Sequence, residues 1–353
     1  MSLTVVVGGQ YGSEGKGKVT SYLALRDNAD VVVRCGGPNS GHTVDVGGRR
    51  FELRSLPAGF VNPRTRLLLA SGSVVDPAVI LDEIKLTGTD PRRVGIDRHA
   101  GIVSPAEAEE ENRLHLRERL GSTLSGTGVA VANRALRKPE FRLARDVPEL
   151  APLQTEVADE VNRVLDRGGS VIIEGTQGFG LSLYHSHDYP YATSRDTTTS
   201  GFLSEVGVSP RLVTSVIMAI RTFPIRVGGN SGPLPNEITW EDVRKRSGYP
   251  VAIAEYTTTT KRLRRVALYS QDLVRRATMI NRPTQLALHG VDYLDYRNLS
   301  VKSSAYLTTN AREFIRQLEL DLGVPISLIG TGPTNEDLID RSVPDNPYEY
   351  DQR

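Results

Sequence analysis

Short, almost uninterrupted runs of Val, Ile and Leu recur along the chain and constrain its fold more than any other feature. Strands covered on both faces of a parallel sheet have this pattern, whereas half-exposed strands alternate apolar and polar residues. Helical patterns lie between the runs, and the alternation predicts an α/β fold with a large, mainly parallel central sheet and helices on both faces. The predicted strands are Thr4–Gly8, Asp30–Arg34, Arg66–Ala70, Ser170–Glu174, Leu212–Ile220 and Pro325–Ile329. The predicted helices are Gly17–Arg26, Pro77–Leu86, Pro105–Leu120, Val157–Arg167 and Ala311–Leu322.

Glycine-rich loops follow several predicted strands, at the carboxyl ends where open α/β sheets bind ligands. These P-loop-like loops are therefore the expected place for nucleotide binding and chemistry. The sequence shows no internal repeat and no linker-like segment, so we predict one domain over residues 1–353 with elaborated loops.

The charge balance argues against a polyanionic partner. Lys and Arg total 43 against 42 acidic residues, which predicts small-molecule substrates, no nucleic acid and no membrane partner. A single cysteine, Cys35, fits a reducing compartment, and no secretory signal or membrane-spanning apolar run is present. We therefore expect a cytoplasmic protein.

The first loop, GGQYGSEGKGK, joins a predicted strand to a predicted helix. Its glycines let backbone N–H groups face an anion, the helix N-terminus adds positive potential, and Lys16 adds a charge. The spacing from Gly9 to Gly15 is one residue longer than in a P-loop, and Gly17 stands where a P-loop has a magnesium-binding hydroxyl. A plain strand-to-helix turn is the alternative, but five glycines and two lysines in eleven residues exceed what a turn requires.

The second loop, CGGPNSGHTV, contains Asn39 and His42 on a glycine-supported segment. If the preceding strand neighbours the first one, the two loops meet. A histidine in this setting suits general acid catalysis near neutral pH, although loop histidines often have only structural hydrogen bonds.

Two further segments carry polar side chains. Residues 174–200, EGTQGFGLSLYHSHDYPYATSRDTTTS, are rich in amides and hydroxyls that suit a purine base, whereas the close pair His185 and His187 lacks a clear third metal ligand. Residues 255–265, EYTTTTKRLRR, combine threonines with arginine forks that bind carboxylates or phosphates. The basic run is also compatible with a solvated face or a nucleic-acid contact, but the small net charge of +1 favours a small anionic substrate.

Together these segments resemble the adenylosuccinate synthetase family from the first strand to about Glu336. The family's GDEGKGK and NAGHT loops correspond to GSEGKGK and NSGHT here. SGSVVDPAVILDEI, EGTQG, YPYATS, RVGGNSGPLP and GTGP follow in the expected order. Seven ordered matches are specific, although no single one would be.

The resemblance implies a ligase that couples L-aspartate to C6 of a purine monophosphate through a 6-phosphoryl intermediate, with Mg²⁺ and a nucleoside triphosphate. It implies a homodimer, with Arg137 reaching across the interface. The implied catalytic residues are Ser13, Lys16, His42 and Gln177, with His42 as the general acid at the 6-oxygen. The implied metal ligands are Ser13 and the Gly41 carbonyl.

The resemblance also implies three binding sets. The triphosphate set is Gly12, Ser13, Glu14, Gly15, Lys16, Gly17, Lys18, Gly41, His42, Thr43, Arg264, Asp292, Gly330, Thr331 and Gly332. The purine monophosphate set is Ser13, Asn39, Ser40, Thr123, Arg137, Gln177, Thr193 and Arg262. The aspartate set is Thr258, Thr259, Thr260, Arg262 and Arg264.

Position 13 departs from the family, which carries an aspartate that accepts the N1 proton of hypoxanthine. A hydroxyl is a weak base, and loss of a general base typically costs about 10²–10⁴-fold in rate, so simple decay of the same enzyme is unattractive. Serine also frees space beside C2 of the purine and can accept a hydrogen bond from the 2-amino group of guanine. This resembles the phage 2-aminoadenylosuccinate synthetases, which act on dGMP for diaminopurine DNA, and a phage-encoded protein would act in the host cytoplasm. An aspartate can also pair with N1 and N2 of guanine.

The donor segment departs as well. The family's guanine-reading TKLD is HGVD here, so Asp292 is kept while Gly290 replaces the lysine that packs on guanine. We therefore predict a ligase joining L-aspartate to dGMP with ATP or dATP. The alternative is an adenylosuccinate synthetase using IMP and GTP, and a different class is a GTP-binding regulator without ligase activity.

Overall fold

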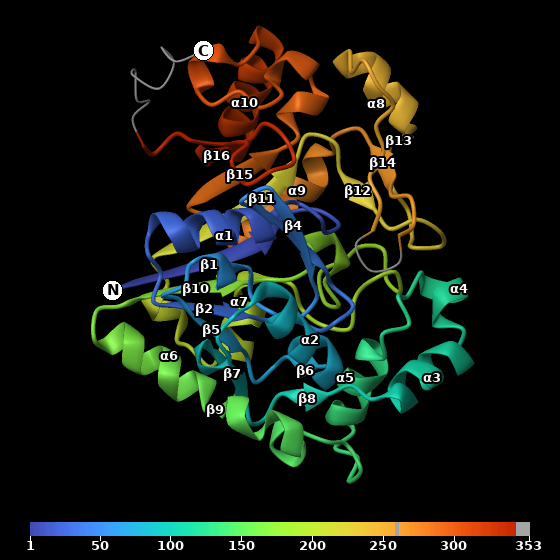
Figure 1. Cartoon of the computed structure of the whole chain (residues 1–353). Helices are drawn as coiled ribbons and strands as arrows, with labels where there is room; N and C mark the ends of the chain where they lie inside the picture. The colour runs from blue at the N-terminus through green and yellow to red at the C-terminus, as the bar shows by residue number, and fades with distance from the viewer. Residues whose placement is uncertain (258–260, 344–353) are drawn as a thin grey trace.

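The computed structural model describes residues 1–257 and 261–343. Its centre is a ten-stranded sheet in the order β17-β16-β15-β11-β1-β10-β2-β5-β7-β9, and most of these strands follow one another from top to bottom in Figure 1. All neighbouring pairs are parallel except β16 and β17. The strands are β1 (Ser2–Gly8), β2 (Val31–Arg34), β5 (Arg66–Leu69), β7 (Val94–Asp97), β9 (Gln154–Thr155), β10 (Ser170–Glu174), β11 (Ser215–Arg221), β15 (Gln285–His289), β16 (Ile326–Gly330) and β17 (Leu338–Asp340).

Helices cover both faces of this sheet, which is why its strands are apolar on both sides. Val6 of β1 packs with the helices on one face, and Val5 and Val7 pack with those on the other. The first face is covered by α1 (Lys16–Arg26) and α2 (Pro77–Thr87). The second is covered by α6 (Val157–Asp166), α7 (Thr199–Val206), α9 (Gln271–Asn281) and α10 (Thr309–Leu322).

The chain places its accessory elements mainly beyond the carboxyl ends of the strands, on the right in Figure 1. These are the hairpin β3 (His42–Val46) and β4 (Arg49–Leu53), the helices α3 (Pro105–Arg113), α4 (Leu116–Leu120) and α5 (Thr127–Ala135), and a small sheet of β12 (Ile225–Arg226), β13 (Glu237–Ile238) and β14 (Arg265–Ala267) with α8 (Trp240–Ser247). A two-stranded sheet pairs β6 (Val74–Val75) with β8 (Gly101–Ile102). Short 3₁₀ helices are Ala58–Val61, Pro91–Arg93, Ala144–Asp146, Pro148–Leu153, Phe179–Leu181, Pro210–Leu212, Val291–Tyr293, Tyr296–Asn298 and Ser304–Tyr306.

Local sequence signals set the ends of these elements. In α2, the Asp76 side chain accepts hydrogen bonds from the first-turn N–H groups of Ala78 and Val79, and Pro77 occupies the first turn. The helix ends at Gly88, which has a φ of 66°.

The predicted α/β fold is confirmed, with corrections to several of its elements. The predicted helix Pro105–Leu120 is broken, because His115 adopts a left-handed φ of 52° between α3 and α4. The strand predicted from Leu212 begins at Ser215, since residues Pro210–Leu212 form a 3₁₀ helix. Strands β7, β9, β15 and β17 of the central sheet were not predicted, nor were helices α5, α7, α8 and α9, and β15 carries part of the site. One domain over residues 1–353 stays a prediction.

Candidate active site

A cavity of about 980 Å³ lies at the carboxyl ends of the central strands. It is lined by the loops after β1, β2 and β10, by the connections around α4, and by residues near α8 and β14. Strand β10 lies between β1 and β2, so the condition that the first two strands be neighbours is not met. The loops still meet, because a Cβ on Gly17 would come within 2.9 Å of the Cβ of His42.

The first loop is held by the buried carboxylate of Glu14. This carboxylate accepts the backbone N–H groups of Gln10 at 3.1 Å and Gly12 at 2.7 Å, and it pairs with the buried ammonium of Lys16. The carboxylate also lies under the loop after β10, where a Cβ on Gly178 would collide with it. These contacts fix the conformation of the loop. The first N–H groups of α1, which lack helical partners, lie beside it.

His42 belongs to a buried charged network with Arg34 and Glu174. Its Nδ1 contacts Glu174 Oε1 and lies 2.7 Å from Arg34 Nη1, which donates to the same carboxylate at 3.0 Å. Glu174 also accepts the N–H of Ala58 at 2.8 Å. The Nε2 atom of His42 has no hydrogen-bond partner within the described residues, and the ring lines the cavity.

Burial, with Arg34 acting in the same direction, lowers the pKa of His42 to about 4, against the opposing effect of Glu174. The imidazole is therefore neutral near pH 7. The Nδ1 contact with the Glu174 carboxylate favours a proton on Nδ1, which leaves a lone pair on Nε2, whereas the contact with the Arg34 guanidinium favours a lone pair on Nδ1. To act as a general acid, His42 must first take up a proton, and an anionic ligand in the cavity favours that uptake.

Ser13 lies on the cavity wall within reach of two arginines. It is exposed, has a φ of 60°, and its hydroxyl is contacted by Arg264. Arg221 donates to the Ser13 carbonyl at 3.1 Å and pairs with Glu255, which also accepts the hydroxyl of Tyr293 at 3.0 Å. These cations lower the pKa of Glu255 despite its burial, so Glu255 stays ionised and is a weak base.

A second part of the cavity lies near Lys18 and Asp292. The Lys18 ammonium donates to the carbonyls of Gly332 at 2.9 Å and Asp337 at 2.7 Å, and burial lowers its pKa to about 8. The Tyr249 hydroxyl donates to Asp292 Oδ2 at 2.5 Å, and burial raises the pKa of Asp292 to about 6.

The structure brings most predicted site residues together around this cavity. Those lining it are Gly12, Ser13, Glu14, Gly15, Lys16, Gly17, Lys18, Asn39, Ser40, Gly41, His42, Thr43, Thr123, Gln177, Thr193, Arg264, Asp292 and Gly332. Their roles stay predictions.

Four predicted residues do not line the cavity. Gly330 and Thr331 are buried beside it, and the Thr331 hydroxyl donates to the Val301 carbonyl. Arg262 packs near Gly229, and the exposed Arg137 follows α5 at a φ of 54°. The predicted residues Thr258, Thr259 and Thr260 lie outside the described part of the chain.

Sequence reasoning assigned no role to five residues that shape the site: Arg34, Glu174, Arg221, Glu255 and His289. Four of them end strands that are otherwise apolar, which is the signal that could have found them. A charged or titratable side chain at the carboxyl end of a buried strand points to the binding edge of the sheet. Glu255 carries no comparable signal.

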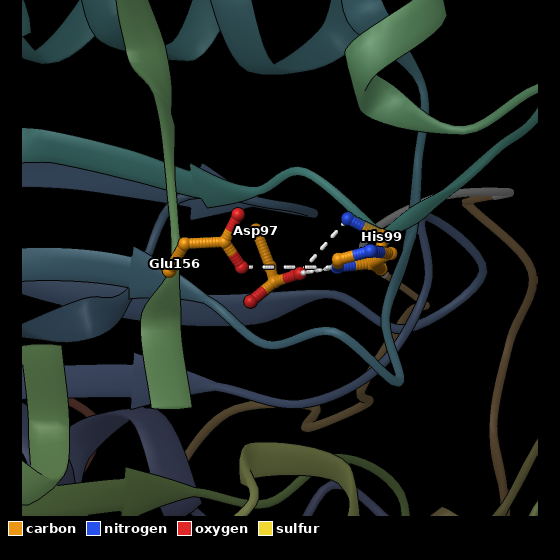
Figure 2. A group of neighbouring side chains, drawn as sticks. All are labelled: Asp97, His99 and Glu156. Carbon is orange, nitrogen blue, oxygen red and sulfur yellow. Dashed lines mark hydrogen bonds and ion pairs between the residues drawn. The ribbon is translucent and has the colours of Figure 1, made fainter. Parts of the chain in front are cut away.

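Asp97, His99 and Glu156 form a separate cluster at the β7–β9 edge of the sheet (Figure 2). His99 Nδ1 lies 3.3 Å from Asp97 Oδ1 and 3.9 Å from Glu156 Oε2. The Asp97 carboxylate already accepts the backbone N–H groups of His99 at 2.8 Å and Val157 at 2.9 Å. The Asp97 carboxylate therefore accepts a hydrogen bond from the first residue of α6, and its contacts do not indicate a metal centre.

The sequence matches the family model described as adenylosuccinate synthetase over residues 5–147 and 140–301. The chain is 42% identical to the adenylosuccinate synthetase of Thermococcus sibiricus, with 95% of this chain and 97% of that protein covered. It is 40% identical to the adenylosuccinate synthetase of Methanocaldococcus jannaschii, with 96% and 97% covered.

Two solved structures share the fold. Fully ligated adenylosuccinate synthetase from Plasmodium falciparum has a TM-score of 0.85 at 22% identity, with 96% of this chain and 100% of that chain covered. Cyanophage S-2L succinoaminodeoxyadenylate synthetase, bound to dGMP and dATP as an energy donor, has a TM-score of 0.81 at 28% identity, with 96% and 95% covered. No helix of the described residues is long and apolar enough to cross a membrane.

Proposed function

The chain belongs to the adenylosuccinate synthetase family of C–N bond-forming ligases, and we propose that it joins L-aspartate to C6 of dGMP with ATP or dATP as phosphoryl donor. The donor's γ-phosphoryl group moves to the 6-oxygen of guanine. The aspartate amine then attacks C6, and the C6–O bond breaks as phosphate leaves. The product is 2-amino-2′-deoxy-N6-succinyladenylate.

Ser13 is the observation that carries the choice of dGMP. The family resemblance implies an aspartate here, whereas this chain presents a neutral hydroxyl on the cavity wall beside Arg264. A hydroxyl oxygen can accept a hydrogen bond from the 2-amino group of guanine. The S-2L phage enzyme, which is bound to dGMP and dATP, supports the same assignment.

IMP with GTP is the second candidate, and the sequence comparisons favour it over the first. The archaeal relatives at 40–42% identity are adenylosuccinate synthetases, whereas the phage enzyme is 28% identical. The two candidates differ in the group at C2 of the purine and in the base of the donor. Assays of one protein preparation with different purine monophosphates and different donors can therefore distinguish the two candidates.

The donor assignment rests on the surroundings of Asp292. Gly290 has a φ of 81°, a conformation in which a lysine would be strained, and a Cβ there would lie 3.0 Å from the Thr222 hydroxyl. Tyr249 already bonds one Asp292 oxygen, and its ring lies 4.7 Å from that of Tyr296 between centroids. Because one oxygen of the Asp292 carboxylate already accepts a hydrogen bond, the group is less available to accept hydrogen bonds from N1 and N2 of guanine. This supports ATP or dATP as the donor.

The family uses Mg²⁺ with its triphosphate, and the residues present fit this ion only in part. Mg²⁺ prefers oxygen ligands, usually one or two carboxylates together with substrate phosphates, and when bound it neutralises charge on the transferring phosphoryl group. The Gly41 carbonyl, at the cavity wall before β3, would hold it. The Ser13 hydroxyl faces the Arg264 guanidinium instead, so it is the weaker of the two predicted ligands.

The geometry of the chain supports two of the remaining predicted roles. Lys16 is held at the first loop by Glu14, where its charge offsets that of a phosphoryl group. Gln177 has a φ of 61° and lies against Gly12, which supports a contact with the purine base. A homodimer with Arg137 at the partner's site, and a cytoplasmic location, stay predictions.

The experiment is phosphate release with L-aspartate and IMP, dIMP, GMP or dGMP, each with ATP, dATP or GTP. Highest kcat/KM for dGMP with an adenine donor supports the proposal, and turnover confined to IMP with GTP overturns it in favour of the second candidate. Nucleotide binding without product from any monophosphate would indicate the non-ligase regulator. In the same assay, Tyr249→Phe frees Asp292 and is expected to raise the use of GTP relative to ATP.

A further inference from the structure

His289 ends β15 at the binding edge of the central sheet and has no role in the function proposed above. It pairs in register with Arg221 of β11 and Gly330 of β16. Its residue surface is 7% exposed, and the ring lines the cavity. It therefore lies in the half of the cavity that contains Lys18 and Asp292, across β1 from His42 and Gln177.

The His289 ring occupies space that two glycines leave free. A Cβ on Gly15, the residue before α1, would lie 2.8 Å from both Cδ2 and Nε2 of His289. A Cβ on Gly330 would lie 2.2 Å from Nδ1. Any other residue at either position would displace the ring, so its placement against the start of α1 is built into the loop.

The Nε2 atom has no hydrogen-bond partner within residues 1–257 and 261–343. An unsatisfied buried polar atom typically costs about 1–3 kcal/mol, so such an atom in a cavity wall points to a ligand. Burial, with the charges of Lys18, Arg221 and Lys16, lowers the pKa of His289 well below its usual value. The ring is therefore neutral, and with its proton on Nε2 it is a hydrogen-bond donor.

The surroundings of Nε2 identify the ligand as an anion. The atom lies beside the N-terminus of α1, where the first N–H groups lack helical partners and the helix dipole favours negative charge. Lys18 adds a cation to this place, and Lys16 adds a second whose charge is paired with the Glu14 carboxylate. The residues predicted to hold the monophosphate, Thr123 and Thr193, come from elsewhere on the cavity wall.

We propose that His289 binds the donor triphosphate, with Nε2–H donating a hydrogen bond to a phosphate oxygen held at the N-terminus of α1. The proposal rests on the proposed function only in requiring that a nucleoside triphosphate enters the cavity. It does not depend on which purine monophosphate is the substrate.

Equilibrium binding of non-hydrolysable ATP and GTP analogues, and of adenosine, tests the assignment with the whole chain. His289→Leu keeps an apolar group of moderate bulk but removes the donor, and should weaken both analogues by about 10- to 100-fold, as for a lost hydrogen bond to a charged group. Adenosine affinity should not change, because it carries no phosphate. The control His99→Leu alters a half-exposed histidine at the β7–β9 edge and should bind all three ligands like the wild type.

A second pair of variants keeps the test decisive if leucine impairs folding. His289→Gln places an amide N–H near the position of Nε2 and should bind the analogues within a few-fold of the wild type, whereas the shorter His289→Asn should not. Equal affinity in the wild type and His289→Leu, or equal losses for analogue and adenosine, would overturn the proposal. A wild type that binds neither analogue would instead overturn the proposed function.

Discussion

His42 is buried between the cation Arg34 and the anion Glu174. Unfolding measured at decreasing pH shows whether the pKa of His42 is lowered or raised in the folded protein. Burial and Arg34 favour the neutral ring, whereas Glu174 favours the imidazolium. The first two prevail and lower the pKa of His42 to about 4. The unfolded chain should titrate near the ordinary histidine value of about 6.5.

The sign of the pH dependence follows from these two values. Between them the unfolded chain binds a proton that the folded chain does not, so the free energy of unfolding falls as the pH falls. With a folded pKa of about 4, the loss from His42 alone is about 2 kcal/mol between pH 7 and pH 5, and about 3 kcal/mol by pH 4.

Urea unfolding of the wild type and His42→Asn at pH 7, 6 and 5 isolates this contribution. Asparagine keeps a short N–H donor for Glu174 but does not titrate. The stability of the wild type relative to the variant should fall by about 2 kcal/mol from pH 7 to pH 5. Contributions from His289 and from other titratable groups that do not contact His42 appear in both proteins and cancel in the difference.

Two results would refute the reasoning. A difference that does not change with pH would show that His42 titrates alike in the folded and unfolded chains. A difference that grows in favour of the wild type on acidification would show that the ion pair with Glu174 outweighs burial and Arg34. In the latter case the free protein would already hold the proton that a general acid needs.

Three further outcomes are expected. Ser13→Asp should lower the ratio of kcat/KM for dGMP to that for IMP by about 10-fold in the phosphate-release assay, since aspartate tolerates the φ of 60° and changes only the side chain. Glu174→Gln should reduce the free energy of unfolding by about 3 kcal/mol in urea, because it leaves the buried Arg34 without its carboxylate. Gly330→Ala should cost about 2 kcal/mol of thermal stability and weaken binding of the ATP analogue, because the new Cβ displaces the His289 ring.

A control variant and two contrary results distinguish these specific effects from a general loss of stability. Glu160→Gln removes a partly exposed pair with Arg66 and should cost less than about 1 kcal/mol, so a loss equal to that of Glu174→Gln would contradict the buried network. An unchanged preference in Ser13→Asp would show that position 13 does not select the purine. Unchanged stability and binding in Gly330→Ala would show that the ring moves freely.

The sequence predicted the layered α/β fold because its strands are apolar on both faces. Val5, Val6 and Val7 are fully buried, with alternate side chains entering the cores on opposite sides of the sheet. The helix predicted over Pro105–Leu120 is divided into α3 and α4, since nothing in its charged pattern shows the left-handed turn at His115. Helix periodicity records which face is buried, but it does not record a break within an exposed segment.

Most of the predicted site residues line the cavity, but the sequence did not identify several of the charged groups that set its electrostatics. Glu174 ends a buried strand in the same motif as Gln177, yet its partners Arg34 and His42 are more than 130 residues away in the chain. His289 has the same limitation, because the burial of its unpartnered Nε2 atom depends on Gly15 and Gly330 lying close to the ring. Motif spacing can place a residue at the edge of a parallel sheet, whereas its protonation state depends on neighbours brought by other strands. The pKa of His42 and the hydrogen-bonding of His289 therefore required the three-dimensional arrangement, and they are the properties that the acid-unfolding and binding experiments measure.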